Sequence, residues 1–425
     1  MIPRSVALQF VLDSVSRLDV VDVGVNDAAG LVLAENVTAM GDVPPFANSA
    51  MDGIAVHAAE TDAGATFRLV GTVAAGDTGA LVVGPGEAAR IMTGAPVPAG
   101  ADAVVMVEDC TFDEGADGET VTIEHRVEPG TSIRPTGDDL SAGAVVMTAG
   151  TVISPGGLAL LRTAGRARVK VVRRPVVGVM STGDELVEPP AALERGQIYD
   201  SNRAAIIGLV RENGFQAVDL GCIRDDEAAL EAALRDGAAR CDAVLSTGGV
   251  SMGDFDLVKA VLARIAEMRW MQIAIKPAKP FAFGTLRVDP SGDDGAHVDP
   301  DGAASRAVPI FGLPGNPISS MVSFELFALA GLRAMAGWAE VERPTVRAVA
   351  AEAFRRRSDG KEHFPRIVVS VGLDGRLHAR SAGGQGSHQL AAMAFANAIA
   401  VLPDGEGVAA GDPIDVRLTG LLARS

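Results

Sequence analysis

PVVGVMSTGDE, residues 175–185, is a short apolar run that ends in a glycine-containing, acidic loop. The same succession of apolar run and glycine-rich loop recurs twice, with loops at residues 246–256 and 312–317. Loops of this kind at the carboxyl ends of parallel strands approach a phosphate through backbone N–H groups, and their carboxylates hold a cation that offsets its charge. The three loops therefore predict one site for a phosphorylated, metal-dependent ligand.

Strand and helix signals alternate across residues 170–335, around these loops. Capping residues at 200–202 and at 225–226 begin two predicted helices, and further helices are predicted at 257–268 and at about 318–336. Repeated strand, loop and helix units predict a parallel, doubly wound α/β sheet.

Both flanks of this region have a different character. Strand-like segments separated by Gly, Pro and Asp clusters run from about 40 to 140 and from about 343 to 425, which predicts two β modules. The first helix, at roughly 5–16, has no nearby partner and is expected to pack on a distant module. Residues 287–306 are rich in Asp, Gly, Pro, Ala and Ser, and predict an exposed insertion between two strands.

The chain is strongly acidic, with a formal charge of −17 from 54 acidic and 37 basic residues. This balance argues against a nucleic-acid groove, because duplex affinity depends on neutralising phosphates. An anionic small molecule needs a local cluster of positive charge, and Lys276 and Lys279 in IKPAKP are the candidates. The flanking prolines fix the spacing of the two ammonium groups, which suits a tetrahedral oxyanion; a solvated surface pair is the alternative.

The cysteine pattern favours a reducing cytoplasm. The three cysteines are isolated, and their spacing is not typical of a disulfide framework or a structural zinc site. The N-terminal residues lack the apolar segment of a secretory signal. The charge-free stretch 141–161 is broken by glycine and proline, so no spanning helix and no membrane partner are expected.

Each candidate loop also has a purely structural interpretation. Asp254 and Asp256 can cap the following helix or present oxygens to Mg²⁺, and Glu185 either faces solvent or holds a cation. LPGNP at 313–317 is a rigid helix start, or a helix N-terminus that aims N–H dipoles at an anion. GGQGSH at 383–388 is a flexible loop or a ligand contact. Neither a Walker A loop nor the dinucleotide-binding fingerprint is present.

Nine segments, taken in order, resemble the MoeA family of molybdopterin molybdenumtransferases, which is related to the E domains of gephyrin and of a plant homologue. They are PPFANSAMDG (44–53), RIMTGAPVPAGADAVVMVED (90–109), IRPTGDD (133–139), STGDEL (181–186), GQIYDSN (196–202), STGGVSMGDFD (246–256), IKPAKPFAFG (275–284), LPGNP (313–317) and GGQGSH (383–388). Together these motifs span nearly the whole chain.

The resemblance implies an elongated homodimer of α/β multidomain protomers. The central element is a doubly wound molybdopterin-binding α/β domain. The implied modules are an N-terminal helix packed on the sheet domain (1–19), a small linker domain (20–39 and 141–167), an inserted β-rich domain (40–140), the molybdopterin-binding domain (168–335) and a C-terminal β-barrel (336–425).

The resemblance also implies that adenylylated molybdopterin and molybdate give molybdenum cofactor and AMP, with Mg²⁺ assisting. The implied catalytic residues are Asp52, Thr93, Glu185, Asp256, Lys276 and Lys279, of which Asp52 and Thr93 would reach the active site from the other subunit. Metal ligands would be Glu185, Asp254 and Asp256, and the residues implied to bind substrate are Asp139, Asp226, Ser251, Pro314, Pro317, Ser319, Arg366 and Ser387. A molybdopterin adenylyltransferase and maturation proteins of molybdenum enzymes are the implied partners.

Two other functions stay open on the sequence. The preceding step, adenylylation of molybdopterin by ATP, fits the sheet domain alone, and a gephyrin-like scaffold fits the C-terminal modules by resemblance. The two β modules and the motif at 44–53 favour molybdate insertion. One departure from the family pattern concerns the lysine pair, since Ala278 stands where glycine is usual.

Overall fold

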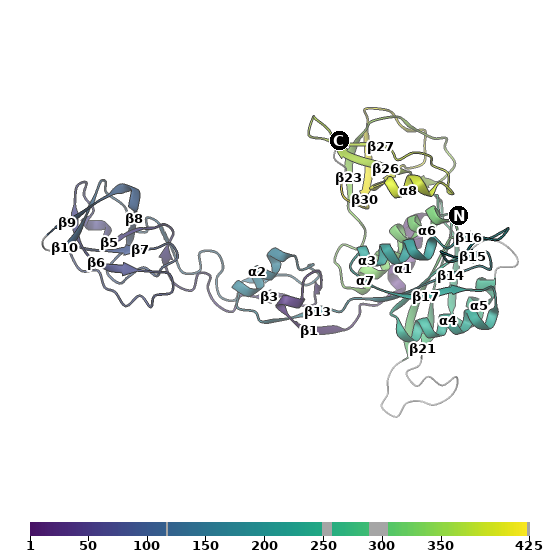
Figure 1. Cartoon of the computed structure of the whole chain (residues 1–425), viewed down its shortest axis with the longest axis horizontal. Helices are drawn as coiled ribbons and strands as arrows, with labels where there is room; N and C mark the ends of the chain where they lie inside the picture. Colours follow the sequence, from purple (N-terminus) through teal and green to yellow (C-terminus); the bar gives the residue numbers. More distant parts are fainter. Residues whose placement is uncertain (116–117, 249–256, 289–304, 423–425) are drawn as a thin grey trace, which may run out of the picture. The chain divides into compact units, whose positions relative to one another are not determined.

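The computed structural model describes residues 1–115, 118–248, 257–288 and 305–422, which divide into two compact units (Figure 1). The first unit comprises Met1–Val21 and Val172–Ser425, and the second comprises Asp22–Val171. The α/β sheet and the C-terminal barrel both belong to the first unit. The inserted β module belongs to the second.

A six-stranded sheet with the order β17-β14-β18-β22-β21-β19 organises the first unit. β17, β14, β18 and β22 run parallel, as predicted, whereas β21 is antiparallel to both of its neighbours. The parallel prediction is wrong at β21 because only residues 273–279 separate it from β19, too few for a crossover. The bounds are β14 (Val176–Thr182), β17 (Gln216–Ile223), β18 (Ala243–Thr247), β19 (Glu267–Gln272), β21 (Pro280–Val288) and β22 (Arg306–Leu313).

Helices follow the strands at the positions where capping residues were expected. Asp226 accepts a hydrogen bond of 2.8 Å from the backbone N–H of Ala229 and so caps α4. The helix predicted at 257–268 ends earlier, at Ile265, because the chain then turns into β19. The helices are α1 (Arg4–Ser14), α3 (Asn202–Glu212), α4 (Glu227–Arg240), α5 (Leu257–Ile265), and a continuous helix made of α6 (Pro317–Ser323), the π-helical segment η4 (Phe324–Ala328) and α7 (Leu329–Met335).

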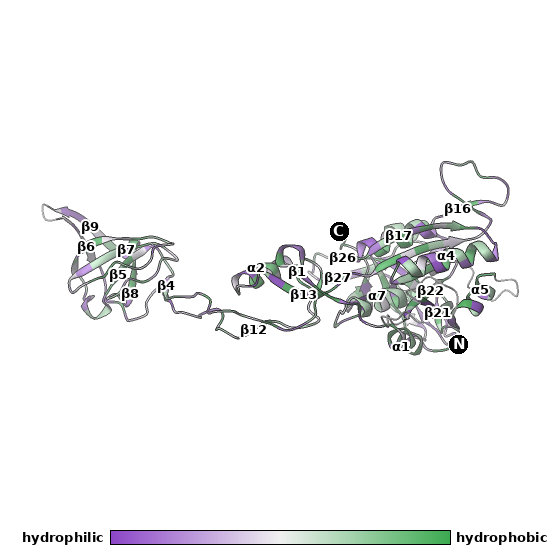
Figure 2. Cartoon of the chain, turned by 90° about the horizontal axis from the view of Figure 1, so that it is seen from below, coloured by the Kyte–Doolittle hydropathy of each residue, from purple (hydrophilic) through white to green (hydrophobic). Residues whose placement is uncertain are grey.

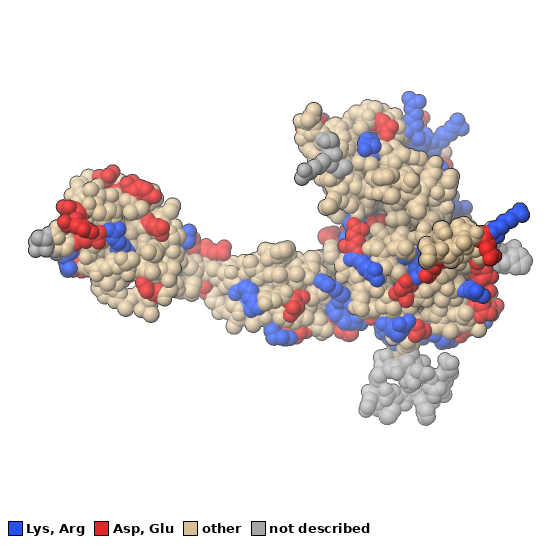
Figure 3. Space-filling view, viewed as in Figure 1, with Lys and Arg blue, Asp and Glu red and all other residues tan. Residues whose placement is uncertain are grey.

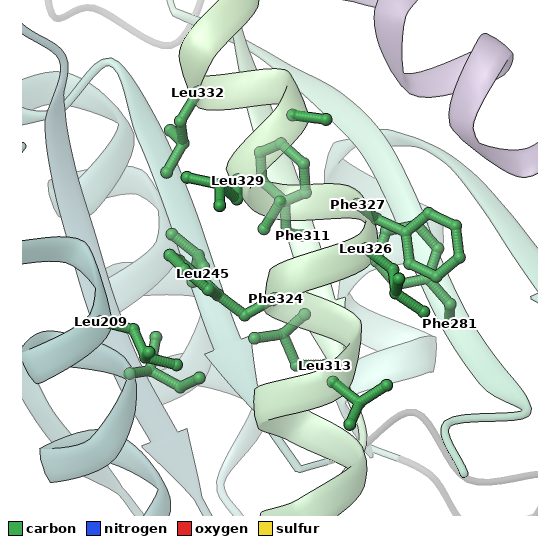
Figure 4. Close-up of a cluster of buried hydrophobic side chains, with 14 of the residues drawn as sticks. Leu209, Leu245, Phe281, Phe311, Leu313, Phe324, Leu326, Phe327, Leu329 and Leu332 are labelled. Atoms are coloured by element: carbon green, nitrogen blue, oxygen red, sulfur yellow. The ribbon is translucent and has the colours of Figure 1, made fainter. Parts of the chain in front are cut away.

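The helix Pro317–Met335 forms the centre of the hydrophobic core. By length and composition it could cross a membrane, but 89% of its apolar window is buried inside the protein, as in the core helix of a globular domain. Figure 4 shows Phe324, Leu326, Phe327 and Leu329 among side chains from the sheet. Hydrophobic residues, green in Figure 2, follow the same strands and helices. Residues Ala7, Leu8 and Val11 of α1 are buried in this cluster.

A closed five-stranded barrel forms the C-terminal region, as predicted. Its strands are β23 (Thr345–Ala350), β27 (Leu377–Ser381), β26 (Arg366–Val371), β28 (Ala398–Val401) and β30 (Pro413–Leu418). Short pairs of strands flank the sheet and the barrel: β15 (Leu186–Val187) with β16 (Ile198–Tyr199), β20 (Ile275–Lys276) with β25 (Glu362–His363), and β24 (Phe354–Arg355) with β29 (Gly407–Val408). The helix α8 (Leu390–Phe395) precedes β28.

The second unit contains a six-stranded sheet with the order β8-β5-β7-β6-β10-β9. Its strands are β5 (Gly53–Val56), β6 (Thr66–Val73), β7 (Glu87–Ile91), β8 (Ala103–Met106), β9 (Cys110–Gly115) and β10 (Gly118–Ile123). Smaller elements flank this sheet in the sequence: β1 (Val20–Gly24), β2 (Val32–Leu33), β3 (Val37–Thr38), β4 (Asn48–Ser49), β11 (Ile133–Arg134), β12 (Val145–Met147), α2 (Pro155–Thr163) and β13 (Arg168–Val172). The α/β multidomain fold class is thus confirmed, while the exact module boundaries stay predictions.

Candidate functional site

A cavity of about 1090 Å³ lies in the first unit, between the α/β domain and the barrel region. Residues 275–280 and Ser319 line it from the α/β domain, and residues 352–366 and 381–387 contribute most of the rest. Lysines and arginines outnumber acidic residues in this lining, although the whole chain carries −17. Five of the predicted site residues meet here, namely Lys276, Lys279, Ser319, Arg366 and Ser387.

The lysine pair reaches the cavity through a short strand pairing. β20 runs parallel to β25, with Lys276 opposite His363, and both lysine side chains are exposed. Ala278, between the lysines, is buried and has a φ of 72°, a conformation that normally favours glycine. Its backbone is therefore strained, and a glycine at this position would relieve that strain. The positive φ also sets the turn that brings Lys279 back to the same cavity.

Arg366 is a buried cation without an acidic partner in the described structure. The residue is 1% exposed, and its guanidinium donates to the carbonyl oxygens of Gly384 at 2.7 Å, Gln385 at 3.2 Å and Gly386 at 3.1 Å. Its Nε has no hydrogen-bond partner, and burial lowers the pKa of the group. A buried charge that only carbonyl dipoles balance is costly. An anion in the adjoining cavity would offset that cost.

The loop at 383–388 wraps around Arg366 instead of hanging free. The side-chain oxygen of Gln385 accepts from the backbone N–H of Arg366 at 3.0 Å, and its amide nitrogen donates to the Arg366 carbonyl at 2.9 Å and to Ser381 Oγ at 3.0 Å. This arrangement places Gln385, Gly386 and Ser387 in the cavity wall. The wall role of Gln385 was not predicted, because the motif marked the loop without assigning a contact to this residue.

A second group in the wall surrounds Asp359. Its carboxylate accepts from His363 Nε2 at 3.2 Å and from Lys361 Nζ at 3.3 Å, and although burial opposes it, these contacts lower the pKa of Asp359 to about 2. Burial lowers the pKa of His363, and the charges of Arg356 and Lys276 act in the same direction. The sequence reasoning missed this group and the run Arg355 to Arg357. Three consecutive arginines in an acidic chain were the available signal.

Where the structure describes them, the three glycine loops meet at the carboxyl edge of the parallel strands; residues 249–256 of the second loop lie outside the described residues. Gly248 donates its N–H to the carbonyl of Leu313 at 3.2 Å, and a Cβ at Gly248 would lie 2.8 Å from the carbonyl oxygen of Thr182. With a φ of 100°, this position requires glycine. Buried polar atoms without a hydrogen-bond partner among the described residues gather on the elements here: Asn202 Oδ1, Ser246 Oγ, Thr247 Oγ1, Asn316 Oδ1 and Ser320 Oγ.

The predicted metal ligands are only partly within the described structure. Glu185 is exposed in the first loop and forms no ion pair with another described residue, whereas Ser251, Asp254 and Asp256 lie outside the described residues. Among residues 1–115, 118–248, 257–288 and 305–422, no group of three or more His, Cys, Asp and Glu residues is arranged to hold a metal ion. Pro314 and Pro317 flank the third loop, and the Asp226 carboxylate caps α4.

Three predicted site residues belong to the second unit. The Asp52 carboxylate accepts from both the backbone N–H of Thr93 at 2.7 Å and the Thr93 hydroxyl at 2.8 Å, which lowers the pKa of Asp52. Asp139 is exposed and donates its backbone N–H to the carbonyl of Val43 at 2.9 Å. The structure thus brings Asp52 and Thr93 together from the two motifs at 44–53 and 90–109.

Comparisons with known proteins cover the chain from end to end. Residues 2–165 match the MoeA N-terminal region (domain I and II), residues 178–334 a probable molybdopterin-binding domain, and residues 347–419 the MoeA C-terminal region (domain IV). The molybdopterin molybdenumtransferase of Haemophilus influenzae is 36% identical, covering 92% of this chain and 91% of that protein. That of Bacillus subtilis is 34% identical over 93% and 89% of the two chains. The crystal structure of a MoeA protein of molybdopterin biosynthesis from Pyrococcus horikoshii OT3 is similar with a TM-score of 0.79 and 27% identity, over 98% of this chain and 100% of that one.

Proposed function

The chain belongs to the MoeA family of molybdopterin molybdenumtransferases, and we propose that it inserts molybdate into adenylylated molybdopterin with release of AMP. The enzyme acts in molybdenum cofactor biosynthesis. The observation that carries the proposal is the buried, uncompensated Arg366 beside Lys276 and Lys279 in one cavity. The position of Arg366 in a cavity lined by further cations supports an anionic ligand there.

Molybdate suits this cavity by charge and by hydrogen-bonding capacity. It is a tetrahedral dianion whose oxygens accept hydrogen bonds, and charge-assisted bonds from guanidinium and ammonium groups are roughly twice as strong as neutral ones. Arg366, Lys276 and Lys279 supply the positive charges, and the hydroxyl groups of Ser319 and Ser387 supply donors. The bound dianion is the missing counter-ion of Arg366.

The glycine loops are the proposed site of the adenylylated substrate. No side chain crowds the backbone at Gly315, and Asn316 Oδ1 and Thr247 Oγ1, which have no hydrogen-bond partner among the described residues, offer polar contacts. Pro314 and Pro317 hold this loop at the start of the long helix. The dithiolene of the substrate receives the metal, so the protein contributes mainly by holding molybdate and substrate in a reactive orientation.

Mg²⁺ is proposed to assist at the same edge of the sheet. The exposed carboxylate of Glu185 has the oxygen chemistry that Mg²⁺ prefers, and the sequence motif adds Asp254 and Asp256. When bound there, the ion would polarise the phosphoanhydride whose cleavage releases AMP. Glu185, at the end of β14, would hold that ion from the first loop.

A homodimer is proposed in which Asp52 and Thr93 complete the site of the second copy. The two Thr93 hydrogen bonds fix the Asp52 carboxylate in its ionised form, which supports a role in holding a donor or a metal-bound water. A molybdopterin adenylyltransferase would supply the substrate, and maturation proteins of molybdenum enzymes would accept the product. The free thiols of Cys110, Cys222 and Cys241 are consistent with a reducing cytoplasm.

Release of AMP by the purified protein tests the proposal. Adenylylated molybdopterin and Mg²⁺ are supplied with and without molybdate, to the wild type, to Lys279→Ala, and to the control Lys170→Ala, whose side chain is exposed and paired with Glu35. We expect molybdate-dependent release in the wild type and the control, and its loss in Lys279→Ala. Release from none of them contradicts the insertion activity. Transfer of AMP from ATP to unadenylylated molybdopterin would instead assign the preceding step.

A further inference from the structure

The run Arg355-Arg356-Arg357 divides into one structural arginine and two exposed ones. Arg356 is the structural member, with a side chain 4% exposed. Its guanidinium donates to the carbonyls of Leu402 at 3.1 Å and Pro403 at 2.9 Å and forms ion pairs of 2.8 Å with Asp359 and Asp404. These contacts anchor the segment between the end of β24 and the cavity.

Arg355 and Arg357 are free of such contacts within the described residues. Both are exposed, both line the cavity, and neither forms an ion pair or side-chain hydrogen bond with another described residue. The local backbone is extended, because Arg355 pairs with Gly407 and the N–H of Arg356 donates to the carbonyl of Glu406 at 3.0 Å. All three arginines line the cavity, but only Arg355 and Arg357 keep exposed side chains there, because the contacts of Arg356 hold its guanidinium.

We propose that Arg355 and Arg357 form an outer anion site that captures molybdate from solution before it reaches the inner group of Lys276, Lys279 and Arg366. This inference rests on the proposed molybdate-insertion function. The chain as a whole carries −17 and repels a dianion, so a local positive rim is needed to raise the concentration of molybdate at the cavity. Basic side chains, blue in Figure 3, project from the C-terminal region of the molecule.

The salt concentration distinguishes the outer arginines from the inner group. A volume of about 1090 Å³ corresponds to a span of roughly 10 Å, about one Debye length at 0.1 M ionic strength. Charges on exposed side chains at that range attract a dianion at low salt and are screened at high salt. The inner group, which includes the buried Arg366, is screened much less.

Molybdate binding by the double variant Arg355→Gln/Arg357→Gln tests the outer site. Equilibrium dialysis of molybdate against the full-length protein, with metal analysis of both chambers, gives the Kd at about 20 mM and about 500 mM salt without requiring turnover. We expect the Kd at low salt to rise about fivefold or more, and the difference from wild type to shrink at high salt. In AMP release, the same loss should fall on kcat/KM for molybdate and be overcome by excess molybdate.

The matched control removes two arginines of the same region that do not line the cavity. Arg347 lies on β23, exposed and paired with Asp415, and Arg376 lies next to the turn before β27. Arg347→Gln/Arg376→Gln has the same net charge as the test variant, so equal Kd values and equal salt dependence in the two would overturn the outer site. A KM increase confined to adenylylated molybdopterin would overturn it as well, by assigning the arginines to the organic substrate. The two proposals can also fail separately. If the wild type releases no AMP but binds molybdate, and the two double variants differ in Kd as expected, the insertion activity is contradicted and the outer site is supported.

Discussion

Arg203 and Arg366 are both buried arginines in the first unit, and they are satisfied in opposite ways. Arg203, at the start of α3, is 8% exposed and forms ion pairs with Asp200 at 2.9 Å, with Asp219 at 2.5 Å and with Glu188. Although burial lowers it, these carboxylates hold the pKa of Arg203 above its usual range. Arg366 is 1% exposed, its guanidinium donates only to carbonyl oxygens among the described residues, and burial lowers its pKa.

The difference separates a structural charge from one kept for a ligand. Around Arg203 the negative charges are already present, so the cluster ties the loop before α3 to the neighbouring strand β17. Around Arg366 the negative charge is missing among the described residues, and the open side is a cavity lined by further cations. Arg333 is also buried without an ion pair among the described residues, but it contacts the Val341 carbonyl and the Trp338 ring and does not line the cavity. It is therefore the combination of a buried cation with a cavity lined by further cations that points to an anionic substrate at Arg366.

The largest expected effect is that of Arg366→Gln on activity. Removing this donor should lower molybdate-dependent AMP release by on the order of 10³-fold, because a preorganised donor to an oxyanion is lost. Stability should change little, with a loss of about 1–2 kcal/mol, since glutamine can still donate to one of the carbonyls and no carboxylate is left unpaired. Single-turnover release and urea unfolding measure the two quantities. Full activity in this variant would show that Arg366 is not part of the site.

Arg203→Met should have the opposite character, with its main effect on folding. The Asp200 side chain is 1% exposed and would keep its charge without a cation, so the free energy of unfolding should fall by about 3 kcal/mol. Urea unfolding at pH 7 measures this loss. Asp219→Asn is the milder companion, because Asp219 is half exposed. Equal unfolding free energies for Arg203→Met and the wild type would contradict the structural role of Arg203.

A substitution at Gln385 would make the environment of Arg366 resemble that of Arg203. Gln385→Glu would place a carboxylate in the loop that wraps Arg366, giving the arginine the counter-ion that Arg203 already has. We expect the Kd for molybdate to rise about tenfold, equal to about 1.4 kcal/mol. Stability should fall as well, because a carboxylate oxygen would replace the amide nitrogen that donates to the carbonyls of Arg366 and Gly383. Gln385→Ala, which removes the same hydrogen bonds without adding charge, is the control. A smaller rise in Kd for glutamate than for alanine would contradict the charge argument.

The smallest expected effect concerns pH and His363. Burial lowers the folded-state pKa of His363 below 6.5, with Arg356 and Lys276 acting in the same direction and the hydrogen bond to Asp359 against it. The stability due to neutral His363 is therefore fully present above pH 6.5 and is lost as the pH falls through the folded-state value. His363→Gln should show a weaker loss of stability than the wild type between pH 7.5 and acidic pH. Parallel unfolding curves for the two proteins across that range would contradict this prediction.

The sheet and its loops could be predicted from the sequence because their signals are local. Apolar runs, a capping residue such as Asp226 and a glycine such as Gly248 each indicate the backbone geometry of the few residues around them. The reversed direction of β21 could not be predicted in this way. It depends on the short connection from β19 and on pairing with β22, which is contributed by a later part of the chain.

The site was predicted only in part, because only some of its residues carry a local signal in the sequence. Lys276 and Lys279 were found because the prolines beside them fix their spacing, whereas Arg366 came only from family resemblance. Nothing near Arg366 in the sequence indicates that it is buried without a carboxylate. The roles of Gln385 and of the exposed arginines depend on contacts between distant parts of the chain, such as those of Arg356 with Leu402 and Asp404, which appear only in three dimensions.

The most direct test of the central claim is anomalous diffraction at the molybdenum absorption edge from crystals of the wild-type protein equilibrated with molybdate. The account predicts a molybdenum peak in the cavity, within hydrogen-bonding reach of Arg366, Lys276 or Lys279 through the molybdate oxygens. A peak elsewhere on the molecule, with the cavity free of molybdenum at saturating molybdate, would contradict it.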